Sequence, residues 1–295
     1  MPPLNFYIVD VFAEEKYAGN QLAVFTDAGT LSTEQMQRLA RETNFSETTF
    51  ILSPTPREGG YDVRIFTPGK ELPFAGHPTL GTAYILQQAL IQQPIETVTL
   101  NLKVGPIPVT ILYQNQQPDV LWMRQNPPVF GEVLTAEAVA PVLHLSIDDI
   151  DPRFPIQEVS TGVPFLIVPL KRLAALQRIQ VNVDQMLALV EPLEAKMLFV
   201  FCPEVRNAAN HFSARMFAHA IGIPEDPATG SASGCFAGYL VEHGYLGSSS
   251  IDVRVEQGYE INRPSLLLLK AEKVEETIEI RVGGKVVMVA RGEFV

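Results

Sequence analysis

The sequence predicts an α+β fold built from two similar halves, each a curled, mostly antiparallel sheet around one central helix. Many short strand-like segments accompany a single long apolar helix in each half. Residues 77–83 also align with residues 226–232 at a constant offset of 149, about half of the 295-residue chain. Strands and helices do not alternate regularly, which argues against a doubly wound parallel sheet.

Three further matches lie upstream of this pair and follow the same order. Residues 64–66 align with residues 215–217, and the remaining two pairs are residues 49–51 with 198–200 and residues 19–24 with 162–167. Four ordered matches indicate a structural repeat. A pseudo-twofold axis between the halves would bring both central helix ends to one cleft, where we expect the active site. The Pro- and Asn-containing stretch at residues 125–128 predicts the domain boundary, which gives an N-terminal half at 1–126 and a C-terminal half at 127–283.

In the first half, the predicted elements follow the apolar patterning and the turn residues. Residues 32–35 form a capping box that opens a helix ending near Arg41. A buried helix is expected from Pro78 to about Leu90. Pro and Asn residues should divide residues 96–124 into four or five strands. The other predicted strands are residues 5–12, 22–25, 48–52 and 61–66.

The second half repeats this order with variations. Helices are expected at residues 135–143, 183–191 and about 229–243, the last ending before Gly244. The predicted strands are residues 156–160, 165–169, 197–201, 212–217, 251–256, 265–270, 277–282 and 285–291.

Composition and charge exclude several classes of protein. The chain is 46% hydrophobic and carries a net charge of −11 without a Lys/Arg cluster, so a nucleic-acid partner is not expected. We expect no signal peptide, and no apolar run is long enough to span a membrane. The two cysteines, Cys202 and Cys235, give neither a disulfide framework nor metal spacing. A cytoplasmic location and no metal site are therefore predicted.

The stretch at residues 224–234 has the features of a helix N-terminus that a ligand can approach closely. Pro227 suits the first helical position, and the small residues from Thr229 through Gly230 and Ser231 leave free N–H groups uncovered for an anion. Asp226 is either a helix N-cap or an acid/base group. Ser231 is interpreted as a hydrogen-bond donor to substrate, with helix packing as the alternative, because it does not lie in the strand–Ser–helix turn of a hydrolase.

Two residues of the first half are further candidates for proton transfer. His77 occupies the position that matches Asp226, so the two could form an acid/base pair at the helix ends. Glu47 lies between Phe45 and Phe50, and partial desolvation there would raise its pKa. The alternative for His77 is a structural histidine, and the alternative for Glu47 is a solvated carboxylate in a turn. Arg64 and its repeat equivalent are expected to pair with carboxylates across each sheet.

Together these segments resemble the phenazine-biosynthesis PhzF-like family, which is related in fold to diaminopimelate epimerase. The resemblance spans essentially the whole chain. It departs from the family pattern at Gln21, where a proline is usual, and at Asn262, where a glycine is usual. The matching stretches are residues 19–20, 46–48, 64–68, 71–80, 160–164, 214–218, 222–232, 256–258, 263–265 and 282–286.

The resemblance implies a cofactor-free isomerase with two barrel-like halves, in which the C-terminal strand, residues 284–295, returns to the first half. It also implies a homodimer. The family's site residues fall on the catalytic Glu47, His77 and Asp226, on Ser231, and on the regions of Gly76 and Gly230, whose N–H groups would bind substrate. We therefore predict acid/base isomerisation of a small carboxylate, with a proton and a double bond moved. The alternatives are an amino-acid epimerase or racemase using Glu47 and Asp226, and a non-catalytic protein that binds small anions.

Overall fold

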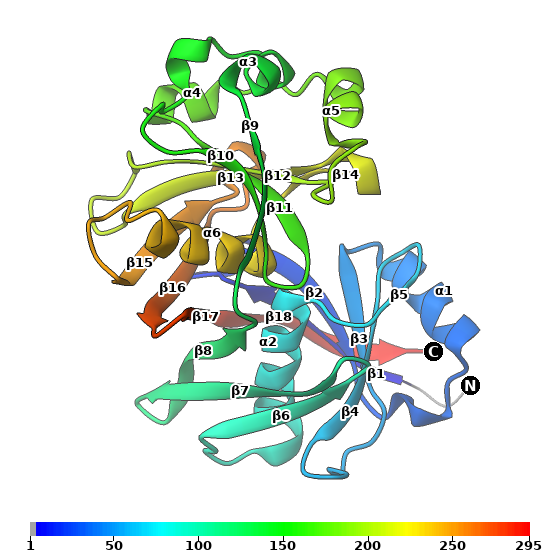
Figure 1. Ribbon diagram of the computed structural model, residues 1–295. Helices are drawn as coiled ribbons and strands as arrows, with labels where there is room; N and C mark the ends of the chain where they lie inside the picture. Colours follow the sequence, from blue (N-terminus) through cyan, green and yellow to red (C-terminus); the bar gives the residue numbers. More distant parts are fainter. Residues whose placement is uncertain (1–3) are drawn as a thin grey trace. The chain divides into compact units, whose positions relative to one another are not determined.

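The computed structural model describes residues 4–295, which divide into two compact units (Figure 1). The first unit contains the chain up to Met123 together with Gly283–Val295, and the second contains Arg124–Val282. Among the described residues, no helix combines the length and the apolar character needed to cross a membrane.

The first unit is a mixed sheet with two principal helices. Its helices are α1 (Thr33–Thr43) and α2 (Gly76–Ile85), and α2 continues as a π-helix (Leu86–Ile91). Its strands are β1 (Leu4–Val11), β2 (Asn20–Phe25), β3 (Glu47–Ile51), β4 (Tyr61–Phe66), β5 (Glu71–Leu72), β6 (Thr97–Leu102), β7 (Gly105–Gln114), β8 (Gln117–Gln125) and β18 (Val286–Phe294).

The second unit repeats this composition and adds short helices. The helices are α3 (Ala136–Val139), α4 (Leu173–Gln177), α5 (Val183–Val190) and α6 (Gly230–Glu242). The strands are β9 (Val129–Leu134), β10 (Ile156–Ser160), β11 (Pro164–Pro169), β12 (Leu198–Cys202), β13 (Phe212–Ala218), β14 (Ile223–Asp226), β15 (Ser250–Gln257), β16 (Ser265–Val274) and β17 (Thr277–Gly284).

Strand pairing follows one pattern in both units, which confirms the predicted repeat. In the first unit, β1 pairs antiparallel with β2, β2 parallel with β3, β3 antiparallel with β4, β4 parallel with β6, and β6 antiparallel with β7. In the second unit, the strands from β10 through β11, β12, β13 and β15 to β16 pair in the same sequence of directions. Each sheet is therefore mostly antiparallel with two parallel pairs.

The parallel pairs explain where the helices lie in the chain. Parallel neighbours need a crossover connection, and such connections are usually helical. Helix α1 makes the crossover from β2 to β3, while α2 connects the β4–β5 pair to β6. In the second unit, α4 and α5 lie between β11 and β12, and α6 connects the β13–β14 pair to β15.

Helices α2 and α6 are the buried central helices that the sequence predicts. Helix α2 packs against β1, β2, β3, β6, β7 and β18, and α6 packs against β10, β11, β15 and β16. The first turns of both helices contain no charged side chain at all, which suits burial on every side. Gly81 permits the close approach of α2 to the sheet, since a Cβ there would lie 2.6 Å from Leu22 Cδ2.

The outer face of the first sheet is closed by α1. Phe25, Phe50 and Phe66 form its core, with the Phe25 and Phe50 rings stacked 5.1 Å apart. The predicted capping box is present, because Gln35 N donates to Ser32 Oγ and Ser32 N donates to Gln35 Oε1. A corresponding apolar core in the second unit includes Leu166, Val168, Leu176, Met186, Leu198 and Val200.

Two element predictions are wrong in detail. Residues 96–124 form three strands rather than four or five, because Pro106 and Pro108 lie inside β7. They are tolerated there because β7 pairs with β8 only from Val109 onward, so their missing N–H groups interrupt no ladder on that side. The helix expected at 135–143 is broken into α3 and a 3₁₀ turn at Pro141.

Candidate active site

The first half-site forms where β2, β3 and α2 begin to pack together. Glu47 is the first residue of β3 and pairs in register with Leu22 of β2, while His77 is the second residue of α2. The structure brings these two predicted residues together, with His77 Nε2 3.6 Å from Glu47 Oε2. Both side chains are largely buried.

His77 is neutral at ordinary pH. Burial lowers the pKa of His77 to about 3, and a backbone hydrogen bond with Gln21 opposes this only in part. The 3.6 Å separation from Glu47 exceeds the range of a normal hydrogen bond. The contact is therefore one between a carboxyl group and a neutral imidazole rather than an ion pair. Gln21 contacts His77 through its backbone only. The presence of glutamine instead of the proline usual in the family therefore does not remove this hydrogen bond.

The N-terminus of α2 can hold an anion. The first intrahelical hydrogen bond runs from Thr79 N to Ala75 O, so the N–H groups of Gly76 and His77 have no intrahelical partner. Pro78 has no N–H group. The positive end of the helix dipole and these two N–H groups together favour a carboxylate at this position.

The second half-site lies at the start of α6. Thr229 is the N-cap residue, and the first intrahelical bond runs from Ser233 N to Thr229 O. The N–H groups of Gly230 and Ser231 are therefore available to an anion in the same way. Asp226 is buried at the end of β14, and its Oδ2 accepts a hydrogen bond from Thr229 Oγ1.

Asp226 is not the helix N-cap, contrary to one of the two predicted roles, and Pro227 is not the first helical residue. The chain stays extended at Asp226, which pairs with Met216 of β13, and the helix begins only at Gly230. The two helix starts therefore differ, since His77 lies inside α2 whereas Asp226 precedes α6. The carboxylate of Asp226 instead contacts the hydroxyl group of Thr229, the residue that caps α6.

Gln257 is a structural residue of this half-site that the sequence reasoning did not single out. Its side chain is fully buried, and its Nε2 donates to Asp226 O while its Oε1 accepts from Thr229 N. Gly258, with φ of +79°, allows the chain to pass close to Pro227, since a Cβ there would lie 2.6 Å from Pro227 O. Gln257 thus fixes the turn between Asp226 and the helix.

The repeated arginines pair with carboxylates, as predicted. Arg64 binds Glu71 through Nε at 2.7 Å and Nη2 at 2.8 Å. Arg215 binds Glu225 in the same bidentate manner, at 2.9 and 2.7 Å. Each pair links the two strands that precede a central helix, β4 to β5 and β13 to β14.

The cysteines are poorly suited to proton transfer. Cys202 and Cys235 are fully buried, and burial raises the pKa of each thiol to about 12. Cys235 lies within α6 and not at its N-terminus. Across residues 4–295, no group of three or more His, Cys, Asp or Glu side chains is arranged to hold a metal ion.

Comparison with known proteins gives full-length matches. A trans-2,3-dihydro-3-hydroxyanthranilate isomerase of Pseudomonas aeruginosa is 34% identical over 289 residues, which cover 98% of each chain. An uncharacterised isomerase of Clostridium acetobutylicum is 33% identical over 299 residues, covering 99% of this chain and 98% of that protein. The crystal structure of a PhzF-family phenazine biosynthesis protein of Bacillus anthracis has a TM-score of 0.92 over 100% of both chains, at 29% identity.

The Pseudomonas and Clostridium relatives are named as isomerases, the Bacillus structure shares the α+β fold, and the present protein is an isomerase. The sequence profile of the phenazine biosynthesis-like protein family matches residues 9–292. The chain belongs to that family, as its motifs predict.

Proposed function

We propose that the protein is a cofactor-independent isomerase that moves a proton, and with it a double bond, on a small substrate bearing a carboxylate. The observation that carries this proposal is the placement of Glu47 and His77 beside the N-terminus of α2, where N–H groups can hold a carboxylate next to a proton-transferring group.

In this mechanism the substrate carboxylate binds the N–H groups of Gly76 and His77 at the start of α2. Negative charge that develops during proton removal is stabilised by these donors and by the helix dipoles. Binding the carboxylate also fixes the neighbouring carbon atoms against the acid/base groups.

Glu47 removes a proton from one carbon atom and returns it to another. His77, held neutral by burial, can donate or accept one hydrogen bond without adding a positive charge beside Glu47. Asp226, already bonded to Thr229, orients the substrate or takes the second proton. The homodimer and the cytoplasmic location stay predictions.

Glu47→Gln tests the central role of Glu47. Turnover of trans-2,3-dihydro-3-hydroxyanthranilate, the compound that the Pseudomonas relative is named for, is followed without added metal or cofactor. We expect turnover to fall by about 10²–10⁴-fold, the usual contribution of a positioned acid/base group, with an unchanged circular dichroism spectrum. The control Glu58→Gln makes the same charge change at an exposed loop of the same unit and should retain full activity. An unchanged rate in the Glu47 variant would remove this residue from the mechanism.

Reaction in deuterium oxide separates the proposed reaction from the alternatives. Deuterium at the carbon atom that receives the proton when the double bond moves supports isomerisation. Inversion of a stereocentre, with deuterium incorporated there, would instead indicate an epimerase or racemase using Glu47 and Asp226. Saturable carboxylate binding with no deuterium incorporation would indicate a binding protein.

A further inference from the structure

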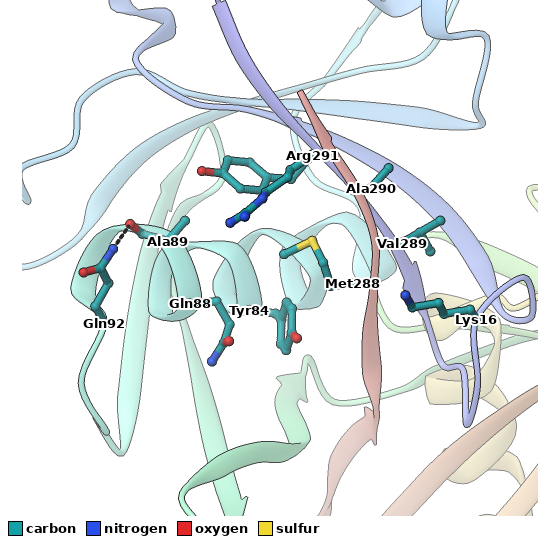
Figure 2. Close-up of a pocket in the computed structure, with 10 residues that line it drawn as sticks. Lys16, Tyr84, Gln88, Ala89, Gln92, Met288, Val289, Ala290 and Arg291 are labelled. Atoms are coloured by element: carbon teal, nitrogen blue, oxygen red, sulfur yellow. Dashed lines mark hydrogen bonds between the residues drawn. The ribbon is translucent and has the colours of Figure 1, made fainter. Parts of the chain in front are cut away.

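A cavity of about 520 Å³ opens in the first unit beside the C-terminal part of the central helix. Its walls are formed by β1, by the π-helical continuation of α2, by the segment Met288–Arg291 of β18, and by Lys16 (Figure 2). The volume falls within the range of small-molecule sites.

Two backbone irregularities lie in the walls of this cavity. The π-helix Leu86–Ile91 places Gln88 against it, and π-helical turns in proteins occur frequently at functional sites. The pairing of β1 with β18 slips at the same place, because Ile8 pairs with Ala290 whereas Val9 pairs with Met288. Such a bulge redirects side chains and is enriched beside functional sites.

The charge of the cavity is opposite to that of the chain. The protein carries a net charge of −11, yet the cavity is lined by Lys16 and Arg291 and by no carboxylate. Within residues 4–295, neither of these cations takes part in an ion pair. A site with two uncompensated positive charges selects for an anion.

The space between the cations is amphipathic. Figure 2 shows Met288 and Arg291 projecting from β18 toward the helix, with Lys16 on the opposite side of Met288 from Arg291. Tyr7 and Tyr84 add ring surface and hydroxyl groups to the walls. A thioether and aromatic rings together suit an apolar or aromatic body.

This cavity is distinct from the first half-site. Tyr84 follows His77 by seven residues on the same helix, which corresponds to about 10 Å along the axis. The π-helical residues lie farther still in the same direction.

We propose that this cavity is a second binding site, specific for a small amphipathic monocarboxylate. The carboxylate pairs with Arg291, the apolar body lies on Met288 and the tyrosine rings, and Lys16 adds positive charge on the other side of Met288. The site does not depend on the reaction assigned to Glu47.

Methionine-methyl NMR tests this site directly in the full chain. The protein labelled with ¹³C-methyl methionine is titrated with benzoate, and the Met288 signal is assigned with Met288→Leu. We expect a saturable shift of the Met288 methyl signal, whereas Met36, buried in the core under α1, should not move. Arg291→Met should weaken binding by about tenfold, since it removes a charge-assisted contact, and Lys16→Met should weaken it less, since it removes only a more distant charge.

Lys70→Met serves as the matched control, because it removes an exposed lysine of the same unit outside the cavity and should leave the affinity within about twofold. Benzamide, which has the same ring without the charge, should not bind. The proposal is overturned if benzoate leaves the Met288 signal unmoved, or if inorganic phosphate shifts it equally well. Tighter binding of succinate than of benzoate would overturn the assignment of an apolar body. Activity of the Glu47→Gln variant has no bearing on any of these outcomes.

Discussion

Replacement of His77 by asparagine should make the first unit less sensitive to acid. His77 is 6% exposed, and burial lowers its pKa from 6.5 to about 3. Between these two pH values the unfolded chain binds a proton at this residue and the folded chain does not. The contribution of His77 to stability is therefore full above pH 6.5 and is lost progressively as the pH falls toward 3.

The size of the effect follows from the pKa difference. Each pH unit below 6.5 costs about 1.4 kcal/mol through this one group, so the change from pH 7 to pH 5 costs about 2 kcal/mol. At pH 3 the cost reaches about 5 kcal/mol, which is comparable to the whole stability of a small domain. Asparagine keeps a polar side chain at the site but cannot be protonated in this range.

Urea unfolding at pH 7 and pH 5 measures this difference. Trp122, the single tryptophan, belongs to the first unit and supplies a fluorescence signal for it. The wild type should lose about 2 kcal/mol more than His77→Asn over this interval. Titrating groups that do not contact His77 contribute alike to both proteins and cancel in the comparison. Equal losses, or an NMR titration of the folded His77 ring near pH 6.5, would refute a neutral buried imidazole.

Two other predictions concern stability and thiol chemistry. Arg215→Met should destabilise the protein by about 3–5 kcal/mol in urea unfolding, because Glu225 is then left buried without its partner. Arg64→Met should cost only about 1 kcal/mol, since the Arg64–Glu71 pair is more exposed and Lys103 also contacts Glu71. Equal losses in the two variants would contradict this reading, and Arg215→Met combined with Glu225→Gln should recover part of the loss. Cys235 should resist iodoacetamide in the native protein and react after unfolding, as burial of its thiol requires; rapid modification of the native protein, measured by mass spectrometry, would show the thiol to be accessible.

Local sequence signals were sufficient to predict much of the fold. The capping box at Ser32 is a short-range pattern, and it marks the start of α1 within one residue. The internal repeat was also visible in the sequence, where the segments around Arg64 and Arg215 match. In the structure these two residues make the same bidentate contact in both units. The proximity of Glu47 to His77 could be anticipated only by assuming that the strand and the helix meet, which the resemblance supplied.

Features that depend on tertiary contacts could not be predicted in this way. The start of α6 is set by Gln257, which lies on a strand far along the chain and holds the turn after Asp226. Proline positions were misleading for a similar reason. Pro106 and Pro108 are tolerated in β7 because the pairing of β7 with β8 begins only at Val109. No local sequence pattern predicts the π-helix Leu86–Ile91.

The repeated arginine–glutamate pairs connect the fold to the candidate chemistry. Glu71 precedes Gly76, the first residue of α2, by five residues, and Glu225 precedes Gly230, the first residue of α6, by the same number. Each pair fixes a short strand against its neighbour immediately before a central helix begins, and a bidentate contact holds both distance and orientation. In the proposed mechanism, binding by helix N–H groups depends on where each helix starts, so these pairs would act as positioning elements for both half-sites. This accounts for the presence of the same bidentate contact in both units, although their helix starts differ in detail.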